Sequence, residues 1–226
     1  MNKLEAVCFD MDGVIIDTEP LYATGEIKLF REYGVEIPEK DWVLFRGCNE
    51  KTFYDLSMNR YKIIEDREVF VNKGRNYVMA EFEKNLNFME GFKSFHSSLI
   101  NNNIKTALVT ASPKEMYKYV DSRLKLTDMF DKVVIGGMAK KNKPNPEPYL
   151  MAMEMLNVKP LNTVVIEDSV HGINAGVNAG TFVVGYRGSI PEKDLDIAHF
   201  KVSSHSELSI ELLNNKLQYS NLTQSN

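Results

Sequence analysis

Cysteine and histidine are scarce in this chain of 226 residues, which contains two cysteines and four histidines. Cys8 and Cys48 show neither the pairing pattern of a disulfide framework nor the spacing of a metal site. A small disulfide-stabilised fold is therefore excluded, and we expect both thiols to be reduced. His171 has no second histidine at ligand spacing, so we expect it to be a hydrogen-bonding helix residue.

Neither an excess of basic residues nor a long apolar run is present. The formal net charge is −4 and the lysines are scattered, so we expect no nucleic acid or membrane surface as a partner. Glu5 and Asp10 interrupt the first apolar stretch, which excludes a signal peptide, and no other stretch is long enough to span a bilayer. We expect a cytoplasmic protein that acts as a monomer.

From about Lys93 onward, short apolar runs alternate with helical patterns. The runs are rich in β-branched residues and lack the alternation of a half-exposed strand, which predicts strands buried on both faces of a doubly wound parallel sheet. The predicted strands are residues 4–9, 106–110, 133–135, 163–166 and 181–184, and two predicted helices are residues 147–156 and 170–179.

Residues 16–87 have a different pattern, with helical periodicity, many charges and no convincing strand. Pro20 lies near one predicted helix start and Gly34 follows its end. We predict a small helical domain inserted into an α/β domain that is formed by residues 1–15 and 88–214. Residues 215–226 are polar, and we predict a frayed C-terminal tail without function.

Two aspartates, Asp10 and Asp12, end the first apolar run, and Gly13 follows them. Residues i and i+2 of a strand lie on one face, so these carboxylates would repel each other unless a cation or proton lay between them. An ordinary turn or a calcium loop is the alternative. A calcium loop is disfavoured because the preceding run is too apolar and no Glu occupies the bidentate position.

A second acidic pair, Glu167 and Asp168, directly follows the predicted strand 163–166. A helix N-cap role for Asp168 or Ser169 is the alternative, but it explains only one acid. Hard oxygen ligands of this kind suit magnesium.

Thr110 ends the predicted strand 106–110, and two more small residues, Ala111 and Ser112, follow it. Ser112 and Glu115 have the spacing of a capping box and Pro113 suits a first helical position, which indicates a well-capped helix. The alternative is functional, because a hydroxyl and backbone N–H groups at a strand end can hold a phosphate. The local sequence favours neither interpretation.

Lys143 begins a segment with prolines at 144, 146 and 148, which cannot be helical until after them and so holds the lysine on a rigid loop. It is either a solvated charge, as we expect for Lys140 and Lys141, or part of a site.

These four motifs, in this order and each near a predicted strand end, resemble the haloacid dehalogenase superfamily. They are Asp-x-Asp-Gly-Val at 10–14, Thr110, Lys-Pro-x-Pro-x-x-Tyr at 143–149, and Glu-Asp-Ser-x-x-Gly-Ile-x-Ala-Gly at 167–176. The resemblance covers about residues 4–187 and is strongest to the β-phosphoglucomutase-like and sugar-phosphate phosphatase subgroup. It implies a Rossmann-like core, an inserted helical cap of the first type, and magnesium-dependent phosphoryl transfer through an aspartyl-phosphate.

The resemblance also implies a role for each motif residue. Asp10 would be the nucleophile, and Asp12 would protonate the leaving oxygen and later deprotonate the incoming one. Magnesium would be held by Asp10, the Asp12 carbonyl and Asp168, with Glu167 acting directly or through water. Phosphate oxygens would be held by Thr110, Ala111, Ser112 and Lys143.

The predicted cap bears on the choice between water and a sugar hydroxyl as acceptor. Tyr22 and Glu50 stand where β-phosphoglucomutase relatives carry a histidine and an arginine, and a glutamate would repel a second phosphate. Arg46, just before Gly47, would compensate that charge in part. The run Asp17-Thr18-Glu19-Pro20 resembles sugar-phosphate phosphatases. The cap residues that we expect to face substrate are Thr18, Tyr22, Arg46, Gly47 and Glu50.

We therefore expect a magnesium-dependent phosphatase that acts on a small phosphorylated metabolite, such as a sugar phosphate. A β-phosphoglucomutase-type mutase and a non-catalytic phosphate-binding regulatory protein are the alternatives. Dehalogenation is disfavoured because it needs neither Asp12 nor the metal-binding acids.

Overall fold

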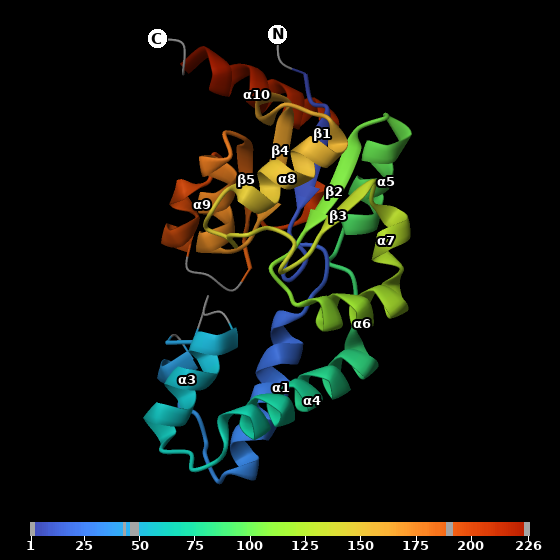
Figure 1. Ribbon diagram of the computed structural model, residues 1–226. Coiled ribbons are helices and arrows are strands. Elements are labelled where there is room, and N and C mark those ends of the chain that lie inside the picture. Colours follow the sequence, from blue (N-terminus) through green and yellow to red (C-terminus); the bar gives the residue numbers. More distant parts are fainter. Residues whose placement is uncertain (1–2, 43, 46–49, 189–191, 224–226) are drawn as a thin grey trace. The chain divides into compact units, whose positions relative to one another are not determined.

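The computed structural model describes residues 3–42, 44–45, 50–188 and 192–223 (Figure 1). The chain divides into two compact units, one formed by Met1–Ile16 with Phe88–Asn226 and the other by Asp17–Asn87. We call them the core and the cap. In the part of the chain that is described, no helix has the length and apolar character needed to cross a membrane.

The core is built on one parallel sheet with the order β3-β2-β1-β4-β5-β6. This order confirms the predicted α/β fold with a parallel sheet. β1 lies inside the sheet, between β2 and β4. The short edge strand β6 was not predicted. The strands are β1 (Ala6–Phe9), β2 (Lys105–Val109), β3 (Lys132–Val134), β4 (Thr163–Glu167), β5 (Phe182–Tyr186) and β6 (Phe200–Val202).

Central strands are buried on both faces, as their continuous apolar runs predict. Every residue of β1, β4 and β5 is buried. Cys8, a free thiol, packs on one face with α8 (Glu147–Leu156) and α9 (Val170–Asn178). Phe9 points to the other face, where it contacts Phe92 and Phe95 of α5 (Phe92–Asn101). The sheet is thus covered on both sides, which leaves its strand ends for chemistry.

The C-terminal segment corrects one prediction. Residues 215–226 were predicted to form a frayed tail, but α10 (Ile210–Thr223) continues through residues 215–223, and the rest of the tail lies outside the described residues. Leu213 and Leu217, one turn apart, are both buried, and Asn214 Oδ1 accepts a hydrogen bond of 2.9 Å from Leu4 N. Two buried leucines and one tertiary hydrogen bond are enough to fix a helix of otherwise polar composition.

The remaining elements complete the core. They are the helices α6 (Lys114–Leu124) and α7 (Leu126–Met129) and the 3-10 turns η1 (Pro160–Asn162), η2 (Glu192–Ile197) and η3 (His205–Glu207).

The regular elements among the described residues of the cap are helices joined by short connections. They are α1 (Glu19–Glu32), α2 (Glu39–Trp42), α3 (Glu50–Tyr61) and α4 (Arg67–Asn85). Pro20 lies in the first turn of α1, and Gly34 follows that helix with a φ of 69°. The helices enclose an aromatic cluster that includes Phe30, Phe53 and Phe70. The cap therefore has a small hydrophobic core of its own.

Candidate active site

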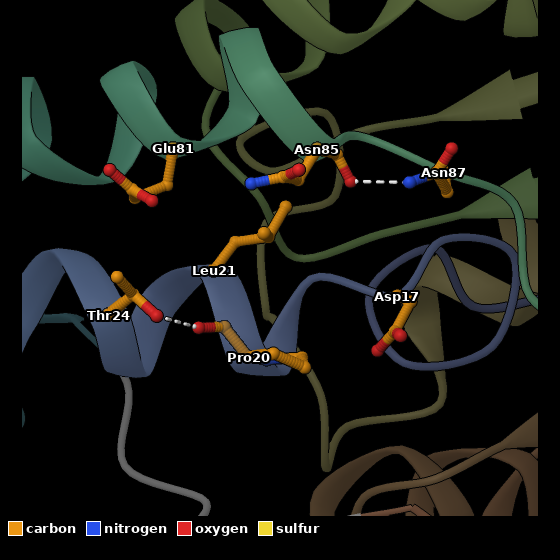
Figure 2. A pocket seen from close by; sticks show the side chains of 7 residues that line it. All are labelled: Asp17, Pro20, Leu21, Thr24, Glu81, Asn85 and Asn87. Carbon is orange, nitrogen blue, oxygen red and sulfur yellow. Dashed lines mark hydrogen bonds between the residues drawn. The ribbon is translucent and has the colours of Figure 1, made fainter.

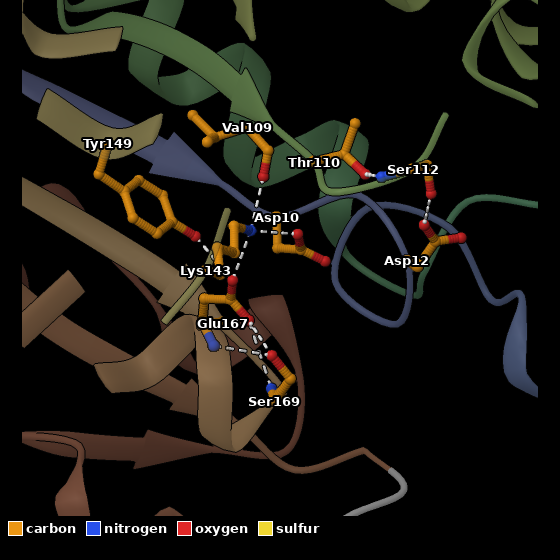
Figure 3. A network of polar contacts seen from close by, with 10 residues as sticks. Asp10, Asp12, Val109, Thr110, Ser112, Lys143, Tyr149, Glu167 and Ser169 are labelled. Carbon is orange, nitrogen blue, oxygen red and sulfur yellow. Dashed lines mark hydrogen bonds and ion pairs between the residues drawn. The ribbon is translucent and has the colours of Figure 1, made fainter. Parts of the chain in front are cut away.

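Three neighbouring strands deliver the site residues to one edge of the sheet (Figure 3). Asp10 follows β1, Thr110 follows β2, and Glu167 ends β4. Asp10 N donates to Ile166 O at 3.0 Å and Thr110 N donates to Val134 O at 2.9 Å. The sheet hydrogen bonding thus extends through these two residues, which fixes their backbones before any side-chain contact is counted.

Lys143 is a buried charge rather than a solvated one. Its Nζ donates to Asp10 Oδ1 at 2.6 Å, to Glu167 Oε1 at 2.6 Å and to Val109 O at 2.8 Å (Figure 3). These three bonds use every hydrogen of the ammonium group. Burial opposes the charge, but Asp10 and Glu167 outweigh it and raise the pKa of Lys143. Lys143 therefore carries a permanent positive charge beside the Asp10 carboxylate.

Glu167 anchors this network from the end of β4. It is fully buried and also accepts hydrogen bonds from Tyr149 Oη at 2.7 Å, Ser169 Oγ at 3.0 Å and Ser169 N at 3.3 Å. With Lys143, these bonds fill the four acceptor positions of a carboxylate. A Cβ at residue 172 would lie 1.7 Å from Glu167 Oε1, so only glycine fits there.

Asp10, Glu167 and Asp168 offer carboxylate oxygens that lie within 4.8 Å of one another. Three carboxylates face the single charge of Lys143, so the cluster keeps an excess of negative charge. Burial raises the pKa of Asp10 to about 7 against the opposing charge of Lys143. Burial, Asp10 and Glu167 also raise the pKa of Asp168 well above its usual range. Such a set of hard oxygen donors fits a divalent cation such as magnesium.

The backbone at Gly13 makes room for this cluster. Gly13 has a φ of 74°, and a Cβ there would lie 2.1 Å from Asp168 Oδ2. A side chain at this position would both strain the backbone and displace the carboxylate. Glycine at position 13, after β1, therefore leaves space for the Asp168 carboxylate at the end of β4.

Asp12 is held by a side chain from the next strand end. Ser112 Oγ donates to Asp12 Oδ2 at 2.7 Å, and Ser112 N donates to Thr110 Oγ1 at 2.9 Å (Figure 3). The predicted capping box of Ser112 and Glu115 is wrong, because α6 begins at Lys114 with Pro113 as its N-cap and no side-chain cap. The Ser112 hydroxyl bonds to Asp12 instead of the helix end.

The start of α9 is capped by Ser169, which accepts a hydrogen bond of 3.0 Å from Gly172 N. The capping interpretation is therefore correct for Ser169 and not for Asp168. This leaves the Asp168 carboxylate to the acidic cluster.

The cap residues predicted for substrate have partners of their own. Glu50 Oε1 and Oε2 accept hydrogen bonds of 2.7 Å each from Nε and Nη2 of Arg75 on α4. The Tyr22 ring packs edge-on against Phe82 at 5.4 Å. Thr18 is the buried N-cap of α1, without a side-chain capping bond. Arg46 and Gly47 lie outside the described residues.

A shallow pocket of about 300 Å³ lies within the cap, between α1 and the end of α4 (Figure 2). Its polar groups are largely engaged locally, since Thr24 Oγ1 bonds to Pro20 O at 2.7 Å and Glu81 pairs with Lys28. Of the predicted substrate residues within the described part of the chain, Thr18, Tyr22 and Glu50, none lines it. The lining residues are Asp17, Pro20, Leu21, Thr24, Glu81, Asn85 and Asn87.

The sequence analysis missed two residues that hold these side chains in place. Tyr149 donates to Glu167 and also lies with its ring centroid 4.9 Å from Lys143 Nζ. The only signal for it was its place in the Lys-Pro-x-Pro-x-x-Tyr motif. Arg75 gave no signal, because its partner Glu50 lies on another helix.

The arrangement agrees with comparisons to known proteins. Residues 7–186 match the family model described as haloacid dehalogenase-like hydrolase. A phosphorylated carbohydrates phosphatase of Thermotoga maritima is 34% identical over 78% of this chain and 82% of its own length. A β-phosphoglucomutase of Bacillus subtilis is 28% identical over 93% of this chain and 94% of its own length.

A solved structure is similar to this chain over nearly its whole length. The crystal structure of β-phosphoglucomutase from Clostridium difficile superposes with a TM-score of 0.80 at 29% identity, over 97% of this chain and 99% of that chain. The parallel sheet, the charged groups at its strand ends and these relatives together identify a phosphohydrolase. This chain belongs to the haloacid dehalogenase-like hydrolase family.

Proposed function

We propose that this phosphohydrolase is a magnesium-dependent phosphatase of small sugar phosphates that works through a phosphate ester on Asp10. One observation carries the proposal. The Asp10 carboxylate lies 2.6 Å from the buried Lys143 ammonium, beside two further carboxylates at the end of the adjacent strand β4. A nucleophile, a fixed positive charge and a cation site thus meet at one point, which is what attack on a phosphate requires.

The residues that would hold magnesium are Asp10, Asp168 and the Asp12 carbonyl. Both Glu167 oxygens already accept hydrogen bonds from Lys143, Tyr149 and Ser169, so Glu167 would serve the metal site by orienting Lys143. When bound, magnesium would withdraw charge from the phosphoryl oxygens and offset the repulsion between carboxylates. The chain supplies the remaining steps.

In the first step a carboxylate oxygen of Asp10 forms a bond to phosphorus while the bond from phosphorus to the leaving oxygen breaks. Asp12 gives its proton to that leaving oxygen. In the second step Asp12 takes a proton from water, the water oxygen attacks phosphorus, and Asp10 leaves with inorganic phosphate released. Ser112 holds Asp12 for both transfers through its 2.7 Å hydrogen bond.

Thr110, Ala111, Ser112 and Lys143 would bind the phosphoryl oxygens. Ser112 N already donates to Thr110 Oγ1 and Ser112 Oγ to Asp12, so Ser112 would shape this strand end, while the Thr110 hydroxyl keeps its own hydrogen for a phosphoryl oxygen. Lys143 would neutralise charge that otherwise opposes attack by Asp10.

Water is favoured over a sugar hydroxyl as the acceptor. The relative from T. maritima is described as a phosphatase of phosphorylated carbohydrates. In addition, Arg75 directs Nε and Nη2 to Glu50, so this guanidinium is already engaged by a carboxylate. A mutase must hold a second phosphate, and an engaged arginine beside a glutamate is a poor place for one.

The test uses β-glucose 1-phosphate with a trace of the 1,6-bisphosphate, and a panel of other sugar monophosphates. We expect release of inorganic phosphate from at least one monophosphate and no more than trace glucose 6-phosphate. Efficient formation of glucose 6-phosphate without phosphate release would establish the mutase instead. If 4-nitrophenyl phosphate and the whole panel stayed intact with magnesium present, the non-catalytic phosphate-binding protein would be the better interpretation.

A further inference from the structure

One buried histidine far along the chain contacts the loop that carries Asp12. His205 belongs to η3, just beyond β6, and is fully buried. Its Nε2 lies 2.7 Å from the carbonyl oxygen of Val14, a residue 191 positions earlier in the sequence. Val14 comes two residues after Asp12, so a side chain from the C-terminal part of the core reaches the proposed catalytic loop.

The surroundings of His205 determine which nitrogen carries the hydrogen. A carbonyl oxygen only accepts, so Nε2 must donate to Val14. His205 Nδ1 is buried and has no hydrogen-bond partner among the described residues, which suits the bare nitrogen of the neutral ring. Aromatic rings surround it, with centroids at 4.9 Å for Tyr186 and 5.5 Å for Phe92. Burial lowers the pKa of His205.

The loop makes other hydrogen bonds, but they mostly close it on itself. Gly13 N donates to Ile16 O at 2.8 Å, and Ile15 N donates to Met11 O at 2.9 Å. Met89 N donates to Ile15 O at 2.9 Å, which joins the two segments where the chain leaves and re-enters the core. The Val14 carbonyl is the point at which the loop is tied to the C-terminal part of the core.

Asp10 and Asp12 therefore depend on different supports. The sheet holds Asp10, through the 3.0 Å bond from its N–H to Ile166 O. Asp12 lies beyond the sheet: Ser112 holds its side chain, and its backbone belongs to the loop that His205 ties down. Loss of the tie should displace Asp12 and leave Asp10 in place.

We propose that His205 is a positioning residue for Asp12: its Nε2–H bond to Val14 holds the loop 11–16 so that the Asp12 carboxyl meets the leaving oxygen. The roles of Asp10 and Asp12 rest on the proposed function, whereas the tie between His205 and the loop does not.

The test compares two substrates that differ in their need for a proton. Nitrophenolate leaves without protonation, whereas phenolate is a poorer leaving group and gains from the Asp12 proton. In His205→Phe, which keeps an aromatic ring but removes the donor, kcat/KM for phenyl phosphate should fall about tenfold further than kcat/KM for 4-nitrophenyl phosphate. A merely structural role would lower both values alike, and that result would overturn the proposal.

The chain offers a matched control in His96, a second buried histidine whose ring, like that of His205, contacts Phe92. Its ring lies 4.8 Å from Phe130, and its Nε2 has no partner within the described part of the chain. His96→Phe should leave the ratio of the two kcat/KM values unchanged. His205→Gln, which places an amide N–H near the position of Nε2, should restore most of the ratio.

Amide hydrogen exchange tests the tie without any assay of activity. Exchange at Gly13, Ile15 and Ile16 should be faster in His205→Phe and unchanged in His96→Phe. Exchange at the wild-type rate in His205→Phe would contradict the tie. If His205→Phe does not fold, His205→Gln is compared with His205→Leu, and equal loop exchange in those two variants contradicts it as well. A wild type that hydrolyses neither aryl phosphate would refute the proposed function and leave the exchange result valid.

Discussion

The core and the cap both contain close ion pairs, but they keep them in different surroundings. Lys143 and Glu167 of the core are 2.6 Å apart, with side chains 6% and 0% exposed. Arg75 and Glu50 of the cap are 2.7 Å apart, with side chains 45% and 42% exposed. The two nitrogen–oxygen distances are nearly equal, so the pairs differ in their exposure to solvent and not in their geometry.

This difference determines what each pair can do. In a buried site the attraction between charges is poorly screened, and a lone charge is costly. At the surface, water and salt weaken the same attraction to about 0–1 kcal/mol. The charges of the buried pair Lys143 and Glu167 thus cannot be changed one at a time, while those of the exposed pair Arg75 and Glu50 can be exchanged at little cost. We expect chemistry to depend on the first group and substrate choice on the second.

The largest effect is expected for Asp10→Asn in the core. Loss of the nucleophile should lower kcat by roughly four orders of magnitude or more. The melting temperature should not fall, because one of several like charges is removed. Phosphate release and a melting curve measure the two effects, with the exposed Asp128→Asn as control. Turnover above about 1% of wild type would show that Asp10 is not the nucleophile.

Next in size is Lys143→Met, which leaves Asp10 and Glu167 buried without their cation. We expect a loss of about 3–5 kcal/mol in the free energy of unfolding, measured by urea titration of the metal-free protein. Lys140→Met on the same loop is the matched control, because Lys140 is exposed and should change stability by less than about 0.5 kcal/mol. Equal effects of the two substitutions would contradict the assignment of Lys143 as a buried structural charge.

A smaller effect concerns magnesium and pH. The folded pKa of Asp10 is raised to about 7 from an ordinary value of 3.8, so this group favours folding below about pH 4, and that contribution is lost as pH rises to 7. Magnesium requires the ionised carboxylate, so it should restore stability most strongly above pH 7. At about 100 times its Kd it should add about 2.7 kcal/mol, or roughly 5–10 °C in Tm.

Thermal melts at about pH 8 and about pH 5.5, with and without magnesium, measure this effect. Asp168→Asn should reduce the magnesium-dependent rise in Tm, and Asp128→Asn should not. A rise of the same size at both pH values would mean that Asp10 does not take part in binding the ion.

The smallest effect is expected in the cap. A double-mutant cycle of Glu50→Gln and Arg75→Gln should give a coupling of about 0.2–1 kcal/mol, like that of the exposed control pair Arg67 and Asp55. Both variants should keep kcat for 4-nitrophenyl phosphate, which is small and carries no sugar. A coupling above about 2 kcal/mol would show that this exposed pair is as strong as a buried one, which contradicts the difference expected between the pairs of the cap and the core.

Much of the core fold was predictable from the sequence because its strands are continuous apolar runs. Residues 163–166 could hardly be anything but a buried strand, and β4 spans Thr163–Glu167. The edge strand β6 has only three residues, Phe200–Val202, and two of them are half-buried, so no apolar run marks it. Short edge strands depend on a neighbour more than on their own composition.

The site residues were recognisable, but their contacts were not. The motifs mark Asp10, Lys143 and Glu167 because prolines, glycines and paired acids are unusual in sequence. Ser112 looked like a helix cap, yet its hydroxyl bonds to Asp12, 100 positions away. Likewise, Glu50 looked like a free charge before the structure placed Arg75 beside it. A local pattern contains no information about which distant residue competes for a polar group.

The arrangement of β1 has a consequence for the order in which this protein is made. β1 leaves the ribosome first, but it pairs with β2 and β4, whose registers align Ala6 with Lys105 and with Thr163. At about 5–20 residues per second, β4 follows β1 by roughly 8–30 s. The cap is one continuous stretch, Asp17–Asn87, and its last helix ends 20 residues before β2 begins and 78 residues before β4 begins, so its described helices are synthesised before either neighbour of β1. A nascent chain therefore folds its cap while the strand that carries Asp10 still waits for its partners.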